Sequence, residues 1–394
     1  MNKRDKILSN IWKLYGYYFF HNLIFAYVIE RLYWQQRGIT IQQVVYTEII
    51  YALVIVILEI PTGYLADKWS RKSMLVLAGI LTFLDFFILI YADSFFDFAL
   101  AVFIAGIQSA LSSGTTNALL YDSLKTCNEQ DKFEKVLGRL NFFDYGAATI
   151  GALVGSFVAS RVSYVSTYWM SLVSVTISFL FAISLIEPKI KTKEDDDEKN
   201  INYIKEAYIF LKGNASIRFV LLLGIVMSSV TIYVDEFFSI YLKEISIPVI
   251  LFGVISGANS LIISVSSIFA YKIKERFSYK SIFSGLITLF TISLILLSII
   301  KVSYGVIALF IFYFSSAMIE PLVSGYLHHR TKSSYRATVE SFQSLVMRVS
   351  TIGVGLLFGV VSTGYSIFIG FRALGILSFI YLVYYGIRQF KYLK

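Results

Sequence analysis

The chain has 394 residues, of which 57% are hydrophobic and 15% charged, whereas soluble domains contain about 45–50% apolar and about 25% charged residues. This composition excludes a soluble globular enzyme and a disordered protein, and the single cysteine, Cys127, excludes an internal disulfide. The net charge of +9 fits the basic loops of a membrane protein. We therefore expect no nucleic-acid partner.

Apolar stretches long enough to cross a bilayer, which takes about 20 residues, recur along the whole chain. They predict twelve transmembrane helices, at residues 13–34, 44–62, 73–92, 95–121, 136–160, 164–186, 215–240, 248–270, 281–300, 304–327, 338–362 and 365–388. The alternating pattern of membrane strands is absent, so an all-α integral membrane protein is expected. No cleavage motif follows the first stretch, which favours a retained helix over a signal peptide.

Lys and Arg indicate the orientation of these helices. Most of the 35 basic residues lie before the first helix, in the loops after even-numbered helices, or at the end of the chain. Because basic loops stay on the cytoplasmic side, both termini are expected in the cytoplasm. We expect a multi-pass protein of the cell membrane.

A polar stretch divides the twelve helices into two sets of six. It predicts an N-terminal bundle at residues 1–187, a cytoplasmic loop at 188–214 and a C-terminal bundle at 215–394. The two bundles resemble each other: the segment Asp67–Ser73 matches Glu275–Ser281 in acid, base, aromatic, Ser and Lys positions, 208 residues later (275 minus 67). Parallel repeats of six helices are typical of one secondary-transporter architecture.

The loop after the second predicted helix carries a specific motif. Its residues Gly63, Leu65, Asp67, Arg71 and Lys72 resemble the G-x-L-a-D-r-x-G-r-[KR] loop of the major facilitator superfamily, with Ser70 in place of a usual Gly. The resemblance covers the whole chain through its length, twelve spans, central loop and repeat. It implies two pseudo-symmetric six-helix bundles, and it implies that the loop charges latch these bundles in the outward-open state and release them on the inward swing.

A drug-exporter-like bacterial branch of that superfamily is suggested by the segment Leu58–Gly63 and by Ala118–Ser123. Two motifs of proton-coupled drug exporters are nevertheless missing. Val102 stands where such exporters commonly carry an Arg, and the fifth helix has glycines but no Pro.

Ionisable side chains inside predicted spans are costly, so each is a candidate for proton coupling or substrate binding. The candidates are Asp144, Glu320, Glu48, Arg348, Asp235, Glu236, Glu30 and His21. For each one the alternative is a structural role: a pair of Asp144 with Arg348, a snorkelling pair of Glu30 with Arg31, or solvation of Asp235 and Glu236 at a helix end. For Asp85, in the third predicted helix, we favour a structural role in which it pairs with another polar group.

Aromatic and amide residues follow one face of the first predicted helix, at Tyr15, Tyr18, Asn22 and Phe25. They would line a cavity for a large apolar or cationic substrate through cation–π contact, or they belong to an interfacial aromatic belt. Asn117 on the fourth helix and Tyr233 on the seventh are further cavity candidates.

Motifs for nucleotide hydrolysis, metal binding and nucleophilic catalysis are absent from the sequence, so we expect no enzyme activity, cofactor or metal. The expected function is secondary active transport by alternating access, with proton-coupled efflux of hydrophobic or cationic compounds such as drugs or toxic metabolites. The alternative is a specific transporter of a nutrient, peptide, siderophore-like metabolite or lipid. The expected partners are a small-molecule substrate, protons and the lipid bilayer, and the protein is expected to be a monomer.

Overall fold

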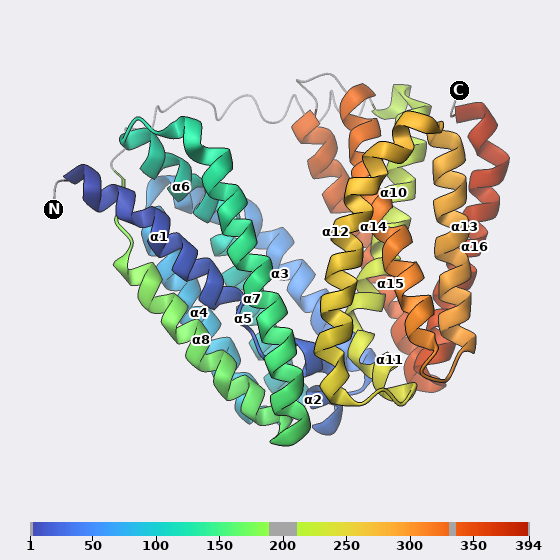
Figure 1. Cartoon of the computed structure of the whole chain (residues 1–394), viewed down its shortest axis with the longest axis horizontal. Coiled ribbons are helices and arrows are strands. Elements are labelled where there is room, and N and C mark those ends of the chain that lie inside the picture. The colour runs from blue at the N-terminus through green and yellow to red at the C-terminus, as the bar shows by residue number, and fades with distance from the viewer. Residues whose placement is uncertain (1–2, 189–210, 331–335, 393–394) are drawn as a thin grey trace. The chain divides into compact units, whose positions relative to one another are not determined.

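A computed structural model describes residues 3–188, 211–330 and 336–392 of the chain (Figure 1). Over these residues the protein is all-helical, and eleven of its helices are long and apolar enough to cross a membrane. The chain forms two compact units, residues 1–193 with 248–257, and residues 194–247 with 258–394. The predicted bundle boundaries stay a prediction, because residues 189–210 lie outside the described part.

The helices that position the candidate site belong to the first unit. Its elements are α1 (Lys3–Asn22), η1 (Tyr27–Ile29), α2 (Glu30–Gln36), α3 (Ile41–Lys68), α4 (Arg71–Tyr91), α5 (Phe95–Ser112), α6 (Thr115–Thr126), η2 (Gln130–Lys132), α7 (Phe133–Arg161), α8 (Tyr164–Ser184) and η3 (Val249–Leu251). In this unit α1 packs against α7 and α8, while α4 packs against α5 and α8 and α3 packs against α5.

The second unit repeats this helical pattern. Its elements are α10 (Ala215–Glu236), α11 (Phe238–Glu244), α12 (Phe252–Arg276), whose first residues up to Gly257 group with the first unit, α13 (Tyr279–Ile299), α14 (Gly305–Arg330), α15 (Arg336–Gly364) and α16 (Ile367–Tyr392). Within the unit, α13 packs against α14 and α16, and α10 packs against α14 and α15.

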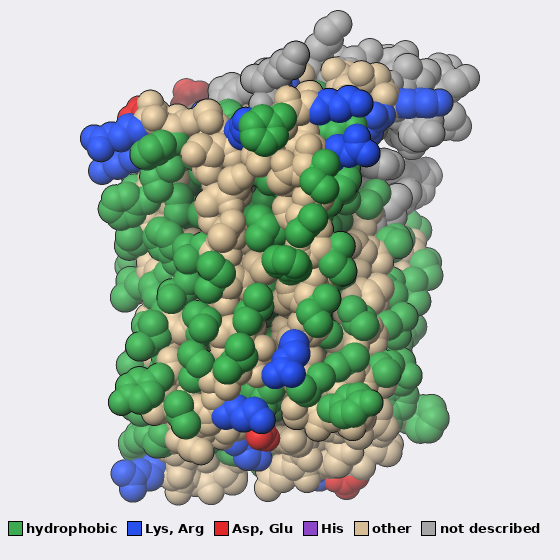
Figure 2. Space-filling view, turned by 90° about the vertical axis from the view of Figure 1, so that its right-hand side faces the viewer, with side chains coloured by type: hydrophobic (Ala, Val, Ile, Leu, Met, Phe, Trp, Pro, Cys, Tyr) green, Lys and Arg blue, Asp and Glu red, His purple; other side chains and the backbone are tan. Residues whose placement is uncertain are grey.

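The outward faces of the helices carry large hydrophobic side chains. On α13 and α16 these include Ile292, Ile295, Phe379 and Ile380, which are 38–61% exposed. Figure 2 shows one face of the molecule covered with hydrophobic side chains in its middle, while Lys and Arg lie mainly toward its two ends. Such an apolar belt with polar ends is the surface that a bilayer requires.

The first predicted span, residues 13–34, is not one continuous helix. Helix α1 begins ten residues earlier, ends at Asn22, and is followed by a non-helical segment, η1 and α2. The break has polar partners: the Ser171 hydroxyl on α8 accepts hydrogen bonds from the backbone N–H groups of Phe25 (3.0 Å) and Ala26 (3.2 Å). Backbone irregularity inside a membrane protein persists only where neighbouring groups satisfy it, as they do here.

A second predicted span, residues 95–121, is also divided. Helix α5 ends at Ser112 and α6 begins at Thr115, with Gly114 between them at a φ of +69°. A glycine reaches this left-handed conformation without steric cost, so the chain turns there.

Candidate functional site

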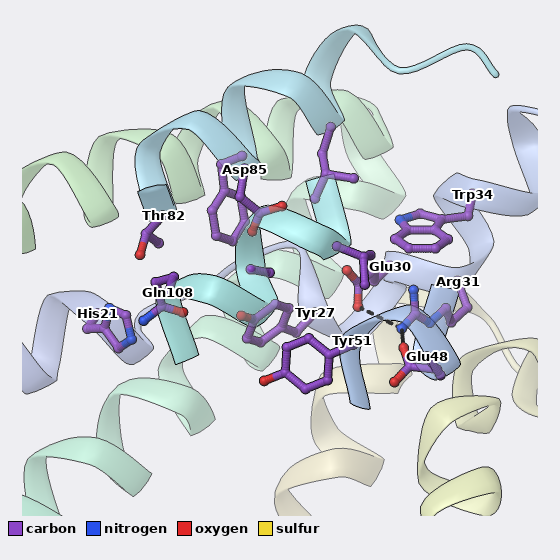
Figure 3. A pocket seen from close by; sticks show the side chains of 14 residues that line it. His21, Tyr27, Glu30, Arg31, Trp34, Glu48, Tyr51, Thr82, Asp85 and Gln108 are labelled. Carbon is purple, nitrogen blue, oxygen red and sulfur yellow. Dashed lines mark hydrogen bonds and ion pairs between the residues drawn. The ribbon is translucent and has the colours of Figure 1, made fainter. Parts of the chain in front are cut away.

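A cavity of about 200 Å³ lies inside the first unit, between the break in α1 and the helices α3, α4 and α5 (Figure 3). It is unusual for an apolar protein because most of its lining is polar or aromatic. The lining residues are His21, Tyr27, Glu30, Arg31, Trp34, Glu48, Tyr51, Thr82, Asp85, Phe86, Leu89, Val102, Ala105 and Gln108. We call this space the acidic cavity, because it collects three carboxyl groups.

One arginine organises two of the three acids. The Arg31 Nη2 atom lies 2.8 Å from Glu48 Oε1 and 3.8 Å from Glu30 Oε2. The guanidinium also lies 4.1 Å from the centre of the Trp34 ring, a cation–π contact. Arg31 is only 7% exposed, and a guanidinium so far from water is stable only with such partners. The break in α1 puts Glu30 and Arg31 at the start of a new helix, from which both side chains reach the cavity.

Asp85 supplies the third carboxyl group, from α4. It lies in the cavity wall one turn from Thr82, and Gln108 of α5 faces the same space (Figure 3). Sequence reasoning assigned Asp85 to structural pairing and did not single out Tyr27, Trp34, Thr82 or Gln108 for the site. The signal that could have found Asp85 was its isolation within a strongly apolar span, where a charged residue needs a polar or aqueous neighbour.

Two neighbouring helices hold the break in α1 in place. On α7, a Cβ atom added to Gly155 would lie 2.0 Å from the Phe25 carbonyl oxygen, and one added to Gly151 would lie 2.8 Å from that of Ile24. On α8, the hydroxyls of Ser174 and Ser178 donate hydrogen bonds to carbonyls of α1, besides the contacts of Ser171. The glycines therefore allow a backbone approach that no larger residue permits, and the serines satisfy the exposed backbone.

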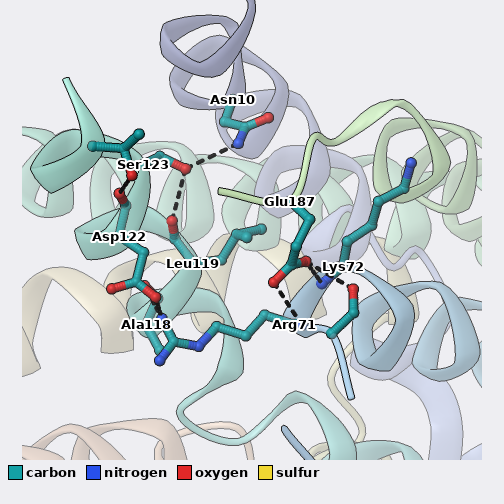
Figure 4. Close-up of polar contacts among 10 residues, drawn as sticks. Asn10, Arg71, Lys72, Ala118, Leu119, Asp122, Ser123 and Glu187 are labelled. Atoms are coloured by element: carbon teal, nitrogen blue, oxygen red, sulfur yellow. Dashed lines mark hydrogen bonds and ion pairs between the residues drawn. The ribbon is translucent and has the colours of Figure 1, made fainter. Parts of the chain in front are cut away.

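The predicted loop motif lies near α6, at the opposite end of the first unit from α2 (Figure 1), and its polar contacts are drawn in Figure 4. The Arg71 side chain forms an ion pair with Asp122 of α6 and donates to the carbonyl of Ala118 at 2.9 Å. The Glu187 carboxylate accepts hydrogen bonds from the Ser70 hydroxyl and from the N–H groups of Arg71 and Lys72, at 2.7–3.1 Å. It thereby satisfies the exposed N–H groups at the start of α4.

Of the motif residues, Leu65 is 41% exposed, while Gly63 and Asp67 lie outside what the structure describes at the level of side chains. The roles of Asp122 and Glu187 escaped the sequence analysis, since both are remote from the motif in the chain.

The structure brings only three of the eight predicted ionisable candidates into the acidic cavity: His21, Glu30 and Glu48. Asp144 is half-buried on α7 and does not line this cavity. In the second unit, Asp235 is hydrogen-bonded to Tyr313, Glu236 ends α10, Arg348 is half-buried on α15 and Glu320 is exposed on α14.

Of the predicted cavity-lining residues, Tyr15, Tyr18 and Asn22 lie at steps of three and four along α1, and Phe25 lies beyond its end. Tyr15 packs against Phe143 on α7 with ring centres 5.1 Å apart. The Asn22 side chain donates a hydrogen bond to the Tyr18 carbonyl. Asn22 is the last residue of α1, and Phe25 therefore lies outside this helix. Asn117 is exposed on α6, and Tyr233 is buried, with its hydroxyl donating to the Thr351 carbonyl at 3.0 Å.

No cluster of three or more His, Cys, Asp or Glu side chains suited to a metal ion occurs among the described residues. The acidic cavity places its carboxyl groups beside aromatic rings.

Known proteins give the chain its context. Among solved structures, the nucleoside transporter NupG in a mutant form superposes with a TM-score of 0.80 at 12% identity, covering 96% of this chain and 99% of its own. A bacterial homologue of the lysosomal transporter Spinster gives a TM-score of 0.71 at 12% identity over 98% of this chain and 96% of its own. A D-xylose–proton symporter gives 0.69 at 13% identity over 95% and 96%. These likenesses show the fold.

In sequence, an uncharacterized transporter of Buchnera aphidicola subsp. Schizaphis graminum (strain Sg) is 26% identical over 163 residues, which are 41% of this chain and 40% of that protein. The match thus spans well under half of that relative. Residues 15–353 match the Major Facilitator Superfamily, which is most of the chain. The chain therefore belongs to the major facilitator superfamily and is a membrane transporter of that kind.

Proposed function

We propose that this transporter exports hydrophobic or cationic compounds in exchange for protons. The observation that supports the proposal is the acidic cavity, with its three carboxyl groups and its aromatic walls. Glu30, Glu48 and Asp85 reach it from three different elements, α2, α3 and α4. Acids placed together within the spanning region, at a high cost in solvation, are expected to bind a proton or a cation.

The charge balance of the cavity favours a cation. When all three carboxyl groups are ionised, the Arg31 guanidinium balances one of them and two negative charges are left (three minus one). Arg31 lies closer to Glu48 than to Glu30, so Glu30 and Asp85 contribute most of this excess. The rings of Tyr27 and Tyr51 add negative faces to the same wall, which stabilises an organic cation further.

Exchange follows from competition for the same carboxylates. A cationic substrate binds when Glu30 and Asp85 are ionised, and protonation of these acids removes the attraction and releases it. If the two six-helix halves alternate in access, protons entering from the acidic side replace the substrate there. Substrate efflux is then driven by the proton gradient.

The test uses purified protein in liposomes with an imposed pH gradient and ethidium as the lipophilic cation. We expect gradient-driven movement that a protonophore abolishes. Asp85→Asn and Glu30→Gln are each expected to weaken ethidium transport about tenfold, which corresponds to about 1.4 kcal/mol of lost binding free energy.

The matched control is Glu134→Gln, which removes an exposed acid of α7 outside the cavity and should transport normally. Equal loss in all three variants, or normal proton-dependent transport by Asp85→Asn, would contradict the assignment.

A specific transporter of a polar nutrient is the second candidate, and one observation favours it. Thr82, Gln108 and His21 place further hydrogen-bonding groups beside the acids, and the superposed structures include transporters of a nucleoside and of a sugar. Saturable transport of one hydroxylated compound, without ethidium movement, would support this candidate over drug efflux.

A further inference from the structure

A second hollow of the first unit lies on its outer surface, between α4 and α8, and plays no part in the acidic cavity. Its volume is about 400 Å³, and it is lined by Trp69, Lys72, Ser73, Val76, Leu77, Ile80 and Ile183. We call it the Lys72 groove. Four of its seven lining residues are aliphatic, and they follow one face of α4 and the last turn of α8.

The groove lies at a membrane boundary. The apolar span of α4 begins at Arg71 and that of α8 ends at Ser184, so both helices leave the hydrocarbon at this level. Trp69 is 69% exposed there, and Trp side chains are enriched at the membrane–water interface. Along the groove toward the hydrocarbon, Leu77 and Ile80 are 36% and 41% exposed. One end of the groove is therefore amphipathic and the rest is apolar.

A second lysine closes the polar end. The Lys13 Nζ atom of α1 donates to the carbonyl of Ser184 at 2.6 Å, next to Ile183 of the groove. It lies close enough to the Lys72 ammonium for the two charges to repel each other. Within the described part of the chain neither lysine forms an ion pair. Two cations held together in this way are stabilised by an anion between them.

Glu187, whose carboxylate contacts the backbone N–H of Lys72, does not supply that anion. Glu187 is held by the Ser70 hydroxyl and by the N–H groups of Arg71 and Lys72, so its carboxylate serves the start of α4. It belongs to the backbone below the groove, and the two ammonium groups remain for an external ligand.

We propose that the Lys72 groove binds one anionic phospholipid. The phosphate lies between Lys13 and Lys72, where the two ammonium groups neutralise it, and Trp69 packs against the glycerol region. One acyl chain follows Val76, Leu77 and Ile80 into the hydrocarbon. Charge complementarity sets the headgroup, because a zwitterionic lipid brings its own cation to a place that already holds two.

The proposal is tested by native mass spectrometry of the full-length protein in detergent, titrated with phosphatidylglycerol or with phosphatidylcholine. We expect one tightly bound phosphatidylglycerol and no comparable phosphatidylcholine adduct. Each lysine near a lipid surface contributes about fivefold in affinity, so Lys13→Gln/Lys72→Gln is expected to weaken phosphatidylglycerol binding about 25-fold.

The control variant, Lys272→Gln/Lys274→Gln, removes the same charge from α12 in the second unit and should bind the lipid as the wild type does. A further variant, Leu77→Trp, fills the apolar groove while keeping both lysines, and is expected to weaken binding as well. All variants are first checked for folding by their thermal unfolding midpoints, which separate lost binding from lost structure.

Three results would overturn the proposal. Equal weakening in both lysine pairs would indicate a general charge effect, and unchanged binding in Leu77→Trp would remove the acyl chain from the groove. Displacement of the lipid by millimolar sn-glycerol 3-phosphate would identify the ligand as a soluble phosphate. None of these results bears on the acidic cavity, so the proposal stands or fails separately from the transport function.

Discussion

In each unit a short helix follows the first long one, but different side chains surround the two junctions. In the first, α1 is broken after Asn22 and the chain continues through η1 into α2; in the second, α10 ends at Glu236 and α11 begins at Phe238. The first break is lined by ions around Arg31. The second is filled by rings: Phe358 packs against both Tyr233 and Phe237, at 5.9 Å and 5.0 Å.

The two halves share their arrangement of helices but differ in the side chains at the break. Both halves keep a short helix after the first long one and a glycine-rich helix beside it, α7 in one and α15 in the other. The first half places an ion-paired cluster around Arg31 at its break, whereas the second half has Asp235, hydrogen-bonded to Tyr313, and Glu236 at the end of α10. In the second half, aromatic side chains also pack against the break.

The strongest test of this contrast is to remove the arginine. Arg31→Gln leaves Glu48 and Glu30 beside each other without a base, and breaking a buried ion pair costs about 3 kcal/mol. The thermal unfolding midpoint in detergent should fall markedly, and Arg31→Gln/Glu48→Gln should recover most of the loss. If the double variant is as unstable as the single one, the ion pair does not stabilise the break.

The second-largest expected difference between the two breaks is the stability cost of replacing the glycines packed against them. A Cβ at Gly155 meets the backbone oxygen of Phe25, whereas one at Gly355 meets a side chain, the hydroxyl and ring of the buried Tyr233. We expect Gly155→Ala to lower the free energy of unfolding by about 2 kcal/mol and Gly355→Ala by about 1 kcal/mol, mainly through the lost Tyr233–Thr351 hydrogen bond. Gly146→Ala on α7, where nothing lies within 4 Å, is the control and should lose nothing.

The third prediction concerns the repeated loops. Ser70 and Ser278, 208 residues apart, each accept a hydrogen bond from the N–H three residues on, at the starts of α4 and α13. Only α4 has Glu187 in addition. Ser278→Ala should cost about 1 kcal/mol, while Ser70→Ala should cost more because it also removes the hydrogen bond that the Ser70 hydroxyl donates to Glu187. Equal costs, measured by chemical unfolding, would show that Glu187 adds nothing.

The smallest expected effect on stability concerns the different partners of the arginines near the starts of α1 and α10. Arg4 near the start of α1 pairs with Glu129, while Arg218 near the start of α10 donates to the backbone carbonyl of Leu211. Hydrogen bonding to Lys132, with a further contribution from Arg4, lowers the pKa of Glu129 from 4.5.

A lowered folded-state pKa means that this contribution is present above pH 4.5 and is lost as the pH falls below it. Glu129→Gln should therefore flatten the acid limb of the stability curve slightly. A variant whose stability follows the wild type down to pH 3 would contradict the role of this pair.

The fold was predictable because each helix that crosses a bilayer needs a long run of apolar residues, which is visible in the sequence. Long apolar stretches, basic loops and the echo of Asp67–Ser73 at Glu275–Ser281 were enough for an all-α transporter of this superfamily. The break in α1 was not predictable from its own residues. Leu23, Ile24, Phe25 and Ala26 are apolar and would continue a helix, and the hydroxyl that stabilises their break belongs to Ser171, 146 residues after Phe25.

The candidate site was predictable in part, because ionisable residues stand out within apolar spans. Glu30, Glu48 and His21 are visible as polar residues in apolar spans, and the structure brings them together. Asp85 and Gln108 were missed because membership of one cavity depends on the rotation of α4 and α5, which a single sequence leaves open. Asp144 was favoured because of its depth in a span, although depth alone does not say which cavity a side chain faces.

The serines that hold α1 have a consequence for how the protein is made. The amides of Phe25 and Ala26 need the Ser171 hydroxyl, and a backbone group left unsatisfied in hydrocarbon costs several kcal/mol. During synthesis α1 leaves the ribosome well before α8 does. Until α8 arrives, the segment after Asn22 must stay in a water-exposed or fully helical form. The mature break is thus a late event of biogenesis, completed only when the sixth predicted span of the first half has entered the membrane.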